Sequence, residues 1–281
     1  MMVGMHLRVG TRTSALAAAH ASATGEELTS RNPGITGFEI VAIPGTEDLS
    51  GEELTARLRE ALLAEDCDII VHSASDIPYE DHPELTLVFP KRDSPHDAFC
   101  GPTDYRGMPH GGRVGTDSAN RAAQMRHFRI DLRPTEVTGD IPSRLDLVGH
   151  SLDGIIVSRA ALTRLGLDGQ DLPYEVIVPV AGQGALALET VTGSVFEEAL
   201  SQAEDSTTRL EMIAERTFIR ELGLDRAAPV GVLGRSTGKT VALHARFMSE
   251  GSKVEIRRSS NNPEKLATDL AAEFVKRGVR A

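Results

Sequence analysis

The stretch GEELTARLREALLAEDCDIIVHSASDIP, residues 51–78, contains two hydrophobic patterns in succession. Residues 51–66 place apolar side chains every three to four positions, a spacing typical of one face of a helix. Residues 67–73 form a short apolar run that suits a strand buried on both faces of a parallel sheet. An amphipathic helix that leads directly into such a strand predicts an α/β fold.

The segments on either side continue this alternation of strands and helices. Residues 7–12 and 37–43 are predicted strands, and residues 14–31 form a predicted helix rich in Ala. The pattern restarts with a strand, a turn and a helix over residues 112–129, followed by a strand and a helix over residues 154–167. The order predicts two α/β lobes, each built on a mostly parallel sheet.

Two turn-rich segments, residues 85–101 and 174–189, are expected to carry the chain from the first lobe to the second and back. The predicted domains are therefore a first lobe of residues 1–88 plus 184–205, a second lobe of residues 89–183, and a C-terminal α+β domain of residues 206–281. The C-terminal domain is expected to hold a long amphipathic helix, three antiparallel strands and a closing helix capped by Asn262. Ligands of open α/β sheets bind beyond the carboxyl ends of the strands, so we expect a central cleft between the lobes.

Charge and composition exclude some classes of partner. The chain of 281 residues has a formal net charge of −11 at pH 7, and an acidic protein repels nucleic acid and anionic membranes. Aromatic residues make up only 4% of the chain and Trp is absent, which disfavours stacking on bases. An anionic ligand would therefore need a local cluster of Arg or Lys.

The two cysteines, Cys67 and Cys100, lie in apolar, strand-like surroundings and are predicted to be buried. Two cysteines are too few for a disulfide framework or a CxxC metal site, and the His residues are scattered, so we expect no metal. No apolar stretch approaches the roughly 20 residues that span a bilayer. The start of the chain lacks the apolar region of a secretory signal, which predicts a cytoplasmic protein.

One candidate anion site follows the first predicted strand. Arg12 lies just after the strand, and Ser14 is placed to cap the helix that follows. Free backbone N–H groups at a helix N-terminus favour an anion, to which Arg12 would add a charge-assisted hydrogen bond. The same residues also fit an ordinary surface arginine beside a helix cap.

A second candidate anion site repeats this design in the stretch VGTDSANR, residues 114–121. Thr116, Asp117 and Ser118 supply capping oxygens, and Arg121 falls in the first helical turn. A matching anion site in each lobe suits a ligand with more than one carboxylate. The carboxylate of Asp117 is expected to compete with such a ligand for the same N–H groups.

The stretch VHSASDIP, residues 71–78, delivers four polar side chains to the end of the buried strand: His72, Ser73, Ser75 and Asp76. Asp76 is a candidate general acid or base, or a carboxylate that stabilises a cationic intermediate. The alternative is an Asp that satisfies the backbone of a turn. Gln183 lies between two glycines, which allow the backbone to approach a ligand or a neighbour closely.

Seven stretches, in order along nearly the whole chain, resemble the porphobilinogen deaminase (hydroxymethylbilane synthase) family. They are LRVGTRTSALA, DIIVHSASDIP, KRDSPHDAF, VGTDSANRAAQ, ALTRLGL, PVAGQGALALE, and AERTFIRELG followed by APVG. The resemblance implies two lobes similar to type II periplasmic binding proteins with a central cleft, a small α+β C-terminal domain, and a monomer. Family members join four porphobilinogen units, releasing ammonia each time, on a dipyrromethane cofactor that a thioether holds to a cysteine.

The resemblance also implies roles for individual residues. Asp76 matches the catalytic aspartate of the family. The family arginines that bind substrate carboxylates match Arg12, Arg121, Arg144 and Arg164. Further residues matching the cleft, or replacing family residues in it, are Ser14, Ser73, Ser75, Thr116, Ser118, Asn120 and Gln183.

The chain departs from the family pattern where the cofactor is attached. The family sequence EGGCQVPIG corresponds here to GLDRAAPVG, residues 223–231, so that Arg226 stands in place of the attachment cysteine. An arginine cannot form the thioether. Asn120 and Thr138 also replace family arginines, and Ser75 replaces a lysine. These departures predict a protein without a covalent cofactor, in which Arg226 contacts a carboxylate of the substrate.

Three functions are consistent with these residues. We interpret the chain as an enzyme that releases ammonia from porphobilinogen or a related acidic pyrrole through an azafulvene, which a nucleophile then captures, without a covalently attached dipyrromethane primer. One alternative is hydroxymethylbilane synthesis in the tetrapyrrole pathway with a non-covalent primer. Another is a non-catalytic protein that binds a carboxylate-bearing ligand. Each function implies a small-molecule partner.

Overall fold

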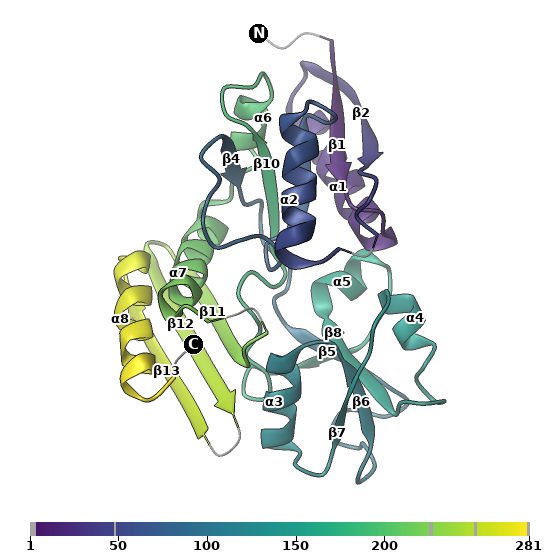
Figure 1. The fold of residues 1–281 in the computed structure, drawn as a ribbon, viewed down its shortest axis with the longest axis vertical. Coiled ribbons are helices and arrows are strands. Elements are labelled where there is room, and N and C mark those ends of the chain that lie inside the picture. The colour runs from purple at the N-terminus through teal and green to yellow at the C-terminus, as the bar shows by residue number, and fades with distance from the viewer. Residues whose placement is uncertain (1–3, 48, 225–226, 250–251, 280–281) are drawn as a thin grey trace. The chain divides into compact units, whose positions relative to one another are not determined.

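The computed structural model describes residues 4–47, 49–224, 227–249 and 252–279 (Figure 1). Arg226, which the sequence assigns to the substrate site, lies outside the described residues. The chain forms two compact units, Met1–Arg92 with Ala185–Arg209 and Asp93–Gly184 with Leu210–Ala281. The predicted C-terminal domain shares the second unit with the second lobe, and its separate boundary stays a prediction.

The first unit is built on a five-stranded sheet with the order β2-β1-β3-β10-β4. β1 pairs in parallel with β2 and β3, whereas β10 runs antiparallel to β3 and β4. Four of the five strands therefore run in the same direction, as expected of a mostly parallel sheet, and the returning strand β10 is inserted antiparallel between β3 and β4. The strands are β1 (Met5–Thr11), β2 (Ile35–Ala42), β3 (Ile69–Ser73), β4 (Leu85–Val88) and β10 (Leu186–Val191).

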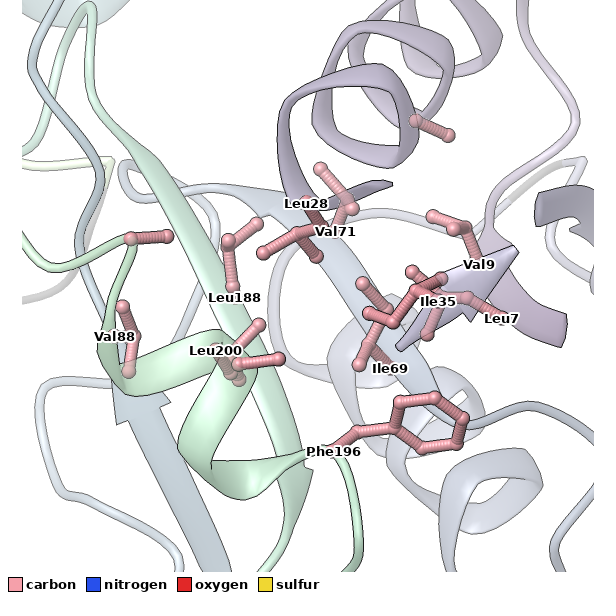
Figure 2. Close-up of a cluster of buried hydrophobic side chains, with 13 residues drawn as sticks. Leu7, Val9, Leu28, Ile35, Ile69, Val71, Val88, Leu188, Phe196 and Leu200 are labelled. Atoms are coloured by element: carbon pink, nitrogen blue, oxygen red, sulfur yellow. The ribbon is translucent and has the colours of Figure 1, made fainter. Parts of the chain in front are cut away.

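Helices cover both faces of this sheet, so that β3 is buried on both sides. Ile69 and Val71 face α1 (Ala15–Arg31) and α6 (Glu197–Ser201) in the core cluster of Figure 2. Ile70, which points the other way, packs with the apolar face of α2 (Gly51–Leu63). The alternation of side chains along a strand explains how one apolar run serves both cores.

The second unit holds a five-stranded sheet with the corresponding order β7-β6-β8-β5-β9. β6 pairs in parallel with β7 and β8, and β5 runs antiparallel to β8 and β9. The strands are β5 (Asp97–Cys100), β6 (Arg113–Thr116), β7 (Arg133–Glu136), β8 (Gly154–Ser158) and β9 (Gln170–Leu172). The helices between them are α3 (Ala119–Phe128), α4 (Ile141–Leu145) and α5 (Arg159–Arg164).

The second unit also contains a three-stranded antiparallel sheet formed by β11 (Val230–Thr237), β12 (Thr240–Ser249) and β13 (Ser252–Ser260). In Figure 1, α8 (Pro263–Lys276) lies along this sheet, and it contacts β12 and β13. Phe274 of α8 meets Phe218 of α7 (Ser206–Leu222) edge to face, with 5.1 Å between the ring centroids. The predicted fold class, two α/β lobes and a small α+β part, is therefore confirmed.

The N-caps predicted for α1 and α8 are confirmed. Ser14 accepts a hydrogen bond from the N–H of Ala17 at 3.2 Å, and Asn262 accepts one from the N–H of Lys265 at 2.9 Å. Both are N-caps, as predicted. Cys67 and Cys100 are buried, also as predicted.

Candidate active site

The predicted site residues of the first unit follow two neighbouring strands that run in the same direction. β1 ends at Thr11 and β3 ends at Ser73, and the two strands pair in parallel. The carboxyl ends of parallel neighbours meet at one edge of a sheet. Arg12 and Ser14 after β1 therefore share an edge with Ser75 and Asp76 after β3.

Asp76 lies on a turn that is held from two sides. Its N–H donates to the carbonyl of Ser73 at 2.9 Å, and its carbonyl accepts from the hydroxyl of Thr55 on α2 at 3.3 Å. The hydroxyls of Ser73 and Ser75 are 2.8 Å apart, and Ser75 Oγ donates to Asp76 Oδ1 at 3.4 Å. The carboxylate is half-buried, so the turn positions it without enclosing it.

A buried ion-pair network lies on the α2 side of β3. Arg59 Nη2 contacts Glu189 Oε1 at 2.5 Å, and His72 Nε2 lies 3.2 Å from Glu189 Oε2. Burial acts to raise the pKa of Glu189, but hydrogen bonds from His72 and Arg59 outweigh it and lower that pKa to about 2. The network ties α2 and β10 to the strand that carries Ser73. Glu189 is a single charge in the strand LALETV, and this is the signal that could have pointed to a buried ion pair.

Arg12 differs from Arg121, Arg144 and Arg164, the other predicted substrate arginines that the structure describes. Its Nε atom is buried and has no hydrogen-bond partner in the described part of the chain. A buried donor without a partner costs about 1–3 kcal/mol, which an anionic ligand would recover. Ser14 is committed to capping α1 through its side chain.

The second unit repeats the arrangement of strand ends. β6, β7 and β8 run in parallel, so the segments after Thr116, Glu136 and Ser158 meet at one edge. The antiparallel strand β5 begins at this same edge, because Asp97 pairs with Ser158. The edge thus gathers Arg121, Arg144 and Arg164, which follow three different strands.

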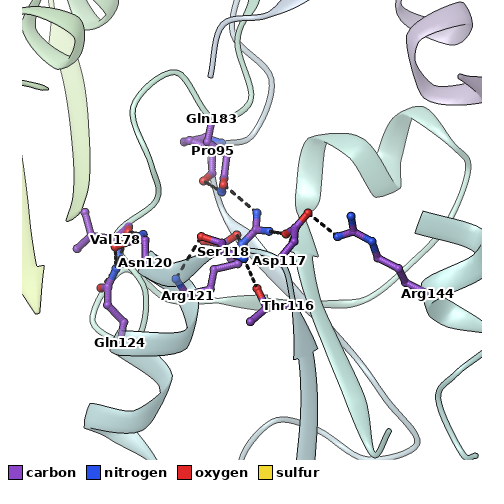
Figure 3. Close-up of polar contacts among 11 residues, drawn as sticks. Pro95, Thr116, Asp117, Ser118, Asn120, Arg121, Gln124, Arg144, Val178 and Gln183 are labelled. Atoms are coloured by element: carbon purple, nitrogen blue, oxygen red, sulfur yellow. Dashed lines mark hydrogen bonds and ion pairs between the residues drawn. The ribbon is translucent and has the colours of Figure 1, made fainter. Parts of the chain in front are cut away.

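Arg121 is held by three side chains (Figure 3). Its Nε donates to Asp97 Oδ1 at 2.7 Å, its Nη2 donates to Gln183 Oε1 at 3.0 Å, and its Nη1 lies 3.5 Å from Asp117 Oδ1. Complete burial raises the pKa of Asp97, although Arg121 and Gln183 act in the opposite direction. Gln183 in turn donates to the carbonyl of Pro95 at 2.8 Å.

Asp117 also pairs with Arg144, whose Nη1 lies 2.7 Å from Asp117 Oδ2. Burial acts to raise the pKa of Asp117, but Arg121 and Arg144 outweigh it and lower that pKa below its usual value. The side chain that caps α3 is Ser118, which accepts from the N–H of Arg121 at 3.3 Å. The carboxylate of Asp117 thus pairs with guanidinium groups, a role that the sequence did not predict.

The structure does not bring every predicted residue to the exposed edge. Asn120 is only 2% exposed, and its amide donates to the carbonyl of Val178 at 2.9 Å and accepts from Gln124 at 2.7 Å. Thr116 is buried and accepts from the N–H of Ser118 at 3.2 Å. Both side chains stabilise the packing around α3, and their contact with a substrate stays a prediction.

Arg164 lies on the surface of the same edge. Its Nη2 donates to Asp93 Oδ2 at 3.0 Å. Exposed ion pairs of this kind contribute little to stability, since water screens them. Each of the three predicted substrate arginines at this edge, Arg121, Arg144 and Arg164, therefore faces a carboxylate of the chain itself.

The two thiols are packed into the cores of separate units. Cys67 is 2% exposed and Cys100 is 8% exposed. Burial is the main cause that raises the pKa of Cys67 to about 12, and burial also raises the pKa of Cys100. A thiolate is the form that reacts with carbon electrophiles, so both thiols are held in an inert state.

Among the described residues, no group of three or more His, Cys, Asp or Glu side chains is arranged to hold a metal ion. No helix within the described ranges has both the length and the apolar character needed to cross a bilayer.

The substitution Glu189→Gln is expected to lower the free energy of unfolding at neutral pH, because it removes the carboxylate that Arg59 and His72 share. A lowered pKa stabilises the fold above the pKa of the unfolded chain, and this stabilisation is lost as the pH falls from 4.5 towards about 2. A shift of this size corresponds to about 3 kcal/mol. Urea unfolding followed by circular dichroism should show wild type and variant converging as the pH falls.

Glu60→Gln is the matched control, since Glu60 is exposed on α2, the helix that carries Arg59, and its ion pair in the described part of the chain is with Arg57. It should change stability little at any pH. A difference between wild type and Glu189→Gln that stays constant with pH would contradict the assigned charge state.

Neither thiol of the folded protein should react with iodoacetamide at about pH 8, because both are buried and protonated there. After unfolding in guanidinium chloride, both cysteines should be alkylated. Mass spectrometry of the peptides that contain Cys67 and Cys100 measures the alkylated fraction of each cysteine in the folded and in the unfolded protein. Rapid alkylation of either cysteine in the folded state would show that a thiol is accessible.

Comparison with known proteins places the chain in a family. Among solved structures, a periplasmic His/Glu/Gln/Arg/opine family-binding protein from Silicibacter pomeroyi in complex with lysine is 16% identical, with 70% of this chain and 88% of that chain covered and a TM-score of 0.38. The porphobilinogen deaminase of Thermus thermophilus is 35% identical over 97% of this chain and 96% of its own length. That of Syntrophus aciditrophicus is 31% identical over 96% of this chain and 94% of its own length. The family model described as "Porphobilinogen deaminase, dipyromethane cofactor binding domain" matches residues 7–195, and the chain therefore belongs to the porphobilinogen deaminase family.

Proposed function

We propose that this protein is an enzyme that releases ammonia from porphobilinogen or a related acidic pyrrole without a covalently attached dipyrromethane primer. Membership of the porphobilinogen deaminase family supports the reaction type. The observation that carries the proposal is the combination of a positioned, half-buried Asp76 with two thiols that are buried in the cores.

The proposed chemistry begins with loss of the aminomethyl nitrogen. The lone pair of the pyrrole nitrogen forms a double bond into the ring, and the bond between the methylene carbon and the ammonium nitrogen breaks. Ammonia leaves with the bonding electron pair, and a cationic azafulvene remains. Asp76 stabilises that cation, because a fixed carboxylate near the pyrrole N–H lowers the energy of positive charge as it develops.

The turn that carries Asp76 suits this role. Its backbone is fixed by Ser73 and Thr55, so the carboxylate needs little reorganisation when the cation forms. Ser75 donates a hydrogen bond to the same carboxylate, which keeps it oriented. Water or the unsubstituted α-carbon of a second pyrrole then bonds to the methylene carbon of the azafulvene, the ring regains its aromatic form, and the proton lost from the nucleophile passes to solvent.

The matched family domain is described as binding a dipyromethane cofactor, and the residues of this chain do not fit its covalent attachment. A thioether requires an accessible thiolate, whereas the two cysteines of the chain, Cys67 and Cys100, are both buried. The resemblance assigns the attachment position to Arg226, which offers no thiol. No step of the proposed reaction passes through a bound cofactor.

Arg12 is the residue proposed to hold a carboxylate of the pyrrole. It shares a sheet edge with Asp76, and its buried Nε atom has no partner in the described chain. A charge-assisted hydrogen bond to a carboxylate contributes about 1.5–3 kcal/mol. One such contact next to Asp76 would orient the pyrrole ring with its N–H towards the carboxylate.

Purified protein incubated with porphobilinogen should release ammonia, and Asp76→Asn should reduce the rate by about 100-fold or more, because it removes the charge that stabilises the cation. Asp66→Asn is the matched control, since Asp66 is exposed at the opposite end of β3. It should retain the wild-type rate. Ammonia release is measured in a coupled enzymatic assay.

Ammonia production that is equal for wild type and Asp76→Asn would refute the proposal. The products identify the capturing nucleophile. A hydroxymethylpyrrole or a short oligomer is expected, whereas a linear tetrapyrrole that cyclises to uroporphyrin would indicate a primer held without a covalent bond.

A further inference from the structure

We infer that Asp117 is a specificity-determining residue, whose carboxylate fills the position between Arg121 and Arg144 that a ligand carboxylate would take. This part of the second unit therefore receives a neutral or positively charged nitrogen group of the ligand. The inference rests on the proposed function for the identity of the ligand, but the contacts that carry it lie within the second unit alone.

The geometry of Asp117 is that of a bridging carboxylate. Oδ2 lies 2.7 Å from Arg144 Nη1, and Oδ1 lies 3.5 Å from Arg121 Nη1 (Figure 3). One oxygen thus faces each guanidinium. A ligand carboxylate bound by both arginines would place its two oxygens in the same way, since guanidinium and carboxylate groups pair in a fixed planar geometry.

Other donors of the two arginines also contact the protein. Arg121 donates to Asp97 through Nε and to Gln183 through Nη2. Arg144 donates through Nε to the carbonyl of Gly139 at 2.7 Å. Both guanidinium groups are therefore oriented by the chain, and Asp117 occupies the side on which they converge.

Exposure shows which charge an approaching ligand meets. The side chains of Arg121 and Arg144 are 12% and 14% exposed, whereas the side chain of Asp117 is 46% exposed. The lowered pKa of Asp117 keeps the carboxylate ionised at neutral pH. The most exposed charged group of the three is thus the carboxylate of Asp117, although two cations lie beside it.

A carboxylate of the ligand is disfavoured here by two effects. It would have to displace Asp117 from both arginines, and the displaced carboxylate would remain close to it as a like charge. An N–H group meets the opposite situation, because the solvent-facing lone pairs of Asp117 accept hydrogen bonds. A pyrrole N–H or a primary ammonium group has the required chemistry.

The substitution Asp117→Asn removes the negative charge and keeps the shape of the side chain, since the amide nearly matches the carboxylate in size. In isothermal titration calorimetry at low salt, the variant should bind malonate at least tenfold more tightly than wild type. It should bind 2-(aminomethyl)pyrrole, a cation without a carboxylate, at least fivefold more weakly. Asp117→Glu keeps the charge and should resemble wild type with both probes.

Asp269→Asn is the matched control, because it removes one negative charge from an exposed Asp–Lys pair on α8. It should leave both affinities unchanged. Asp117→Ser is a second variant with a smaller side chain and should shift both affinities in the same direction as Asp117→Asn, provided that circular dichroism shows a native fold.

The inference is overturned if wild type and Asp117→Asn bind malonate with equal affinity. It is also overturned if neither Asp117→Asn nor Asp117→Ser binds malonate measurably. Neither probe requires turnover, so the result does not depend on the proposed function. Ammonia release that fails in wild type while Asp117→Asn gains malonate binding would reject the proposed reaction and leave the role of Asp117 intact.

Discussion

Both α/β units depend on one constraint, the parallel pairing of two strands: β1 with β3 in the first unit and β6 with β8 in the second. β1 of the first unit and β6 of the second both end in the sequence Val-Gly-Thr, at residues 9–11 and 114–116. A Cβ atom on Gly10 would lie 2.5 Å from Cys67 Sγ, and one on Gly115 would lie 2.7 Å from Leu152 Cδ1. The glycines therefore allow neighbouring side chains to pack closely against β1 and β6. The residues that follow each strand then lie at the carboxyl edge of its own sheet.

Features that depend on neighbouring residues could be predicted from the sequence. Ser14 and Asn262 were identified as helix caps because a cap and the N–H that it accepts lie three positions apart. The insertion of β10 beside β3 could not be predicted, since it joins segments more than 100 residues apart. The pairing of Glu189 with Arg59, and the position of Asp117 between Arg121 and Arg144, depend equally on the folded geometry.

The two units differ in the partners of their predicted substrate arginines. In the second unit, Arg121, Arg144 and Arg164 each face a carboxylate of the chain. In the first unit, Arg12 retains a buried donor without a partner among the described residues, and it shares an edge with Asp76. A ligand with few carboxylates fits this distribution better than a long oligomer with many, because most of the available positive charge is already compensated.

The central claim is that this family member performs its chemistry with no pyrrole bonded to the polypeptide. Intact-protein mass spectrometry under denaturing conditions, applied to protein produced in cells that make porphobilinogen and then allowed to turn over, tests it most directly. The account predicts the mass of the unmodified chain before and after turnover. An added mass equal to two or more pyrrole units that survives denaturation would contradict it.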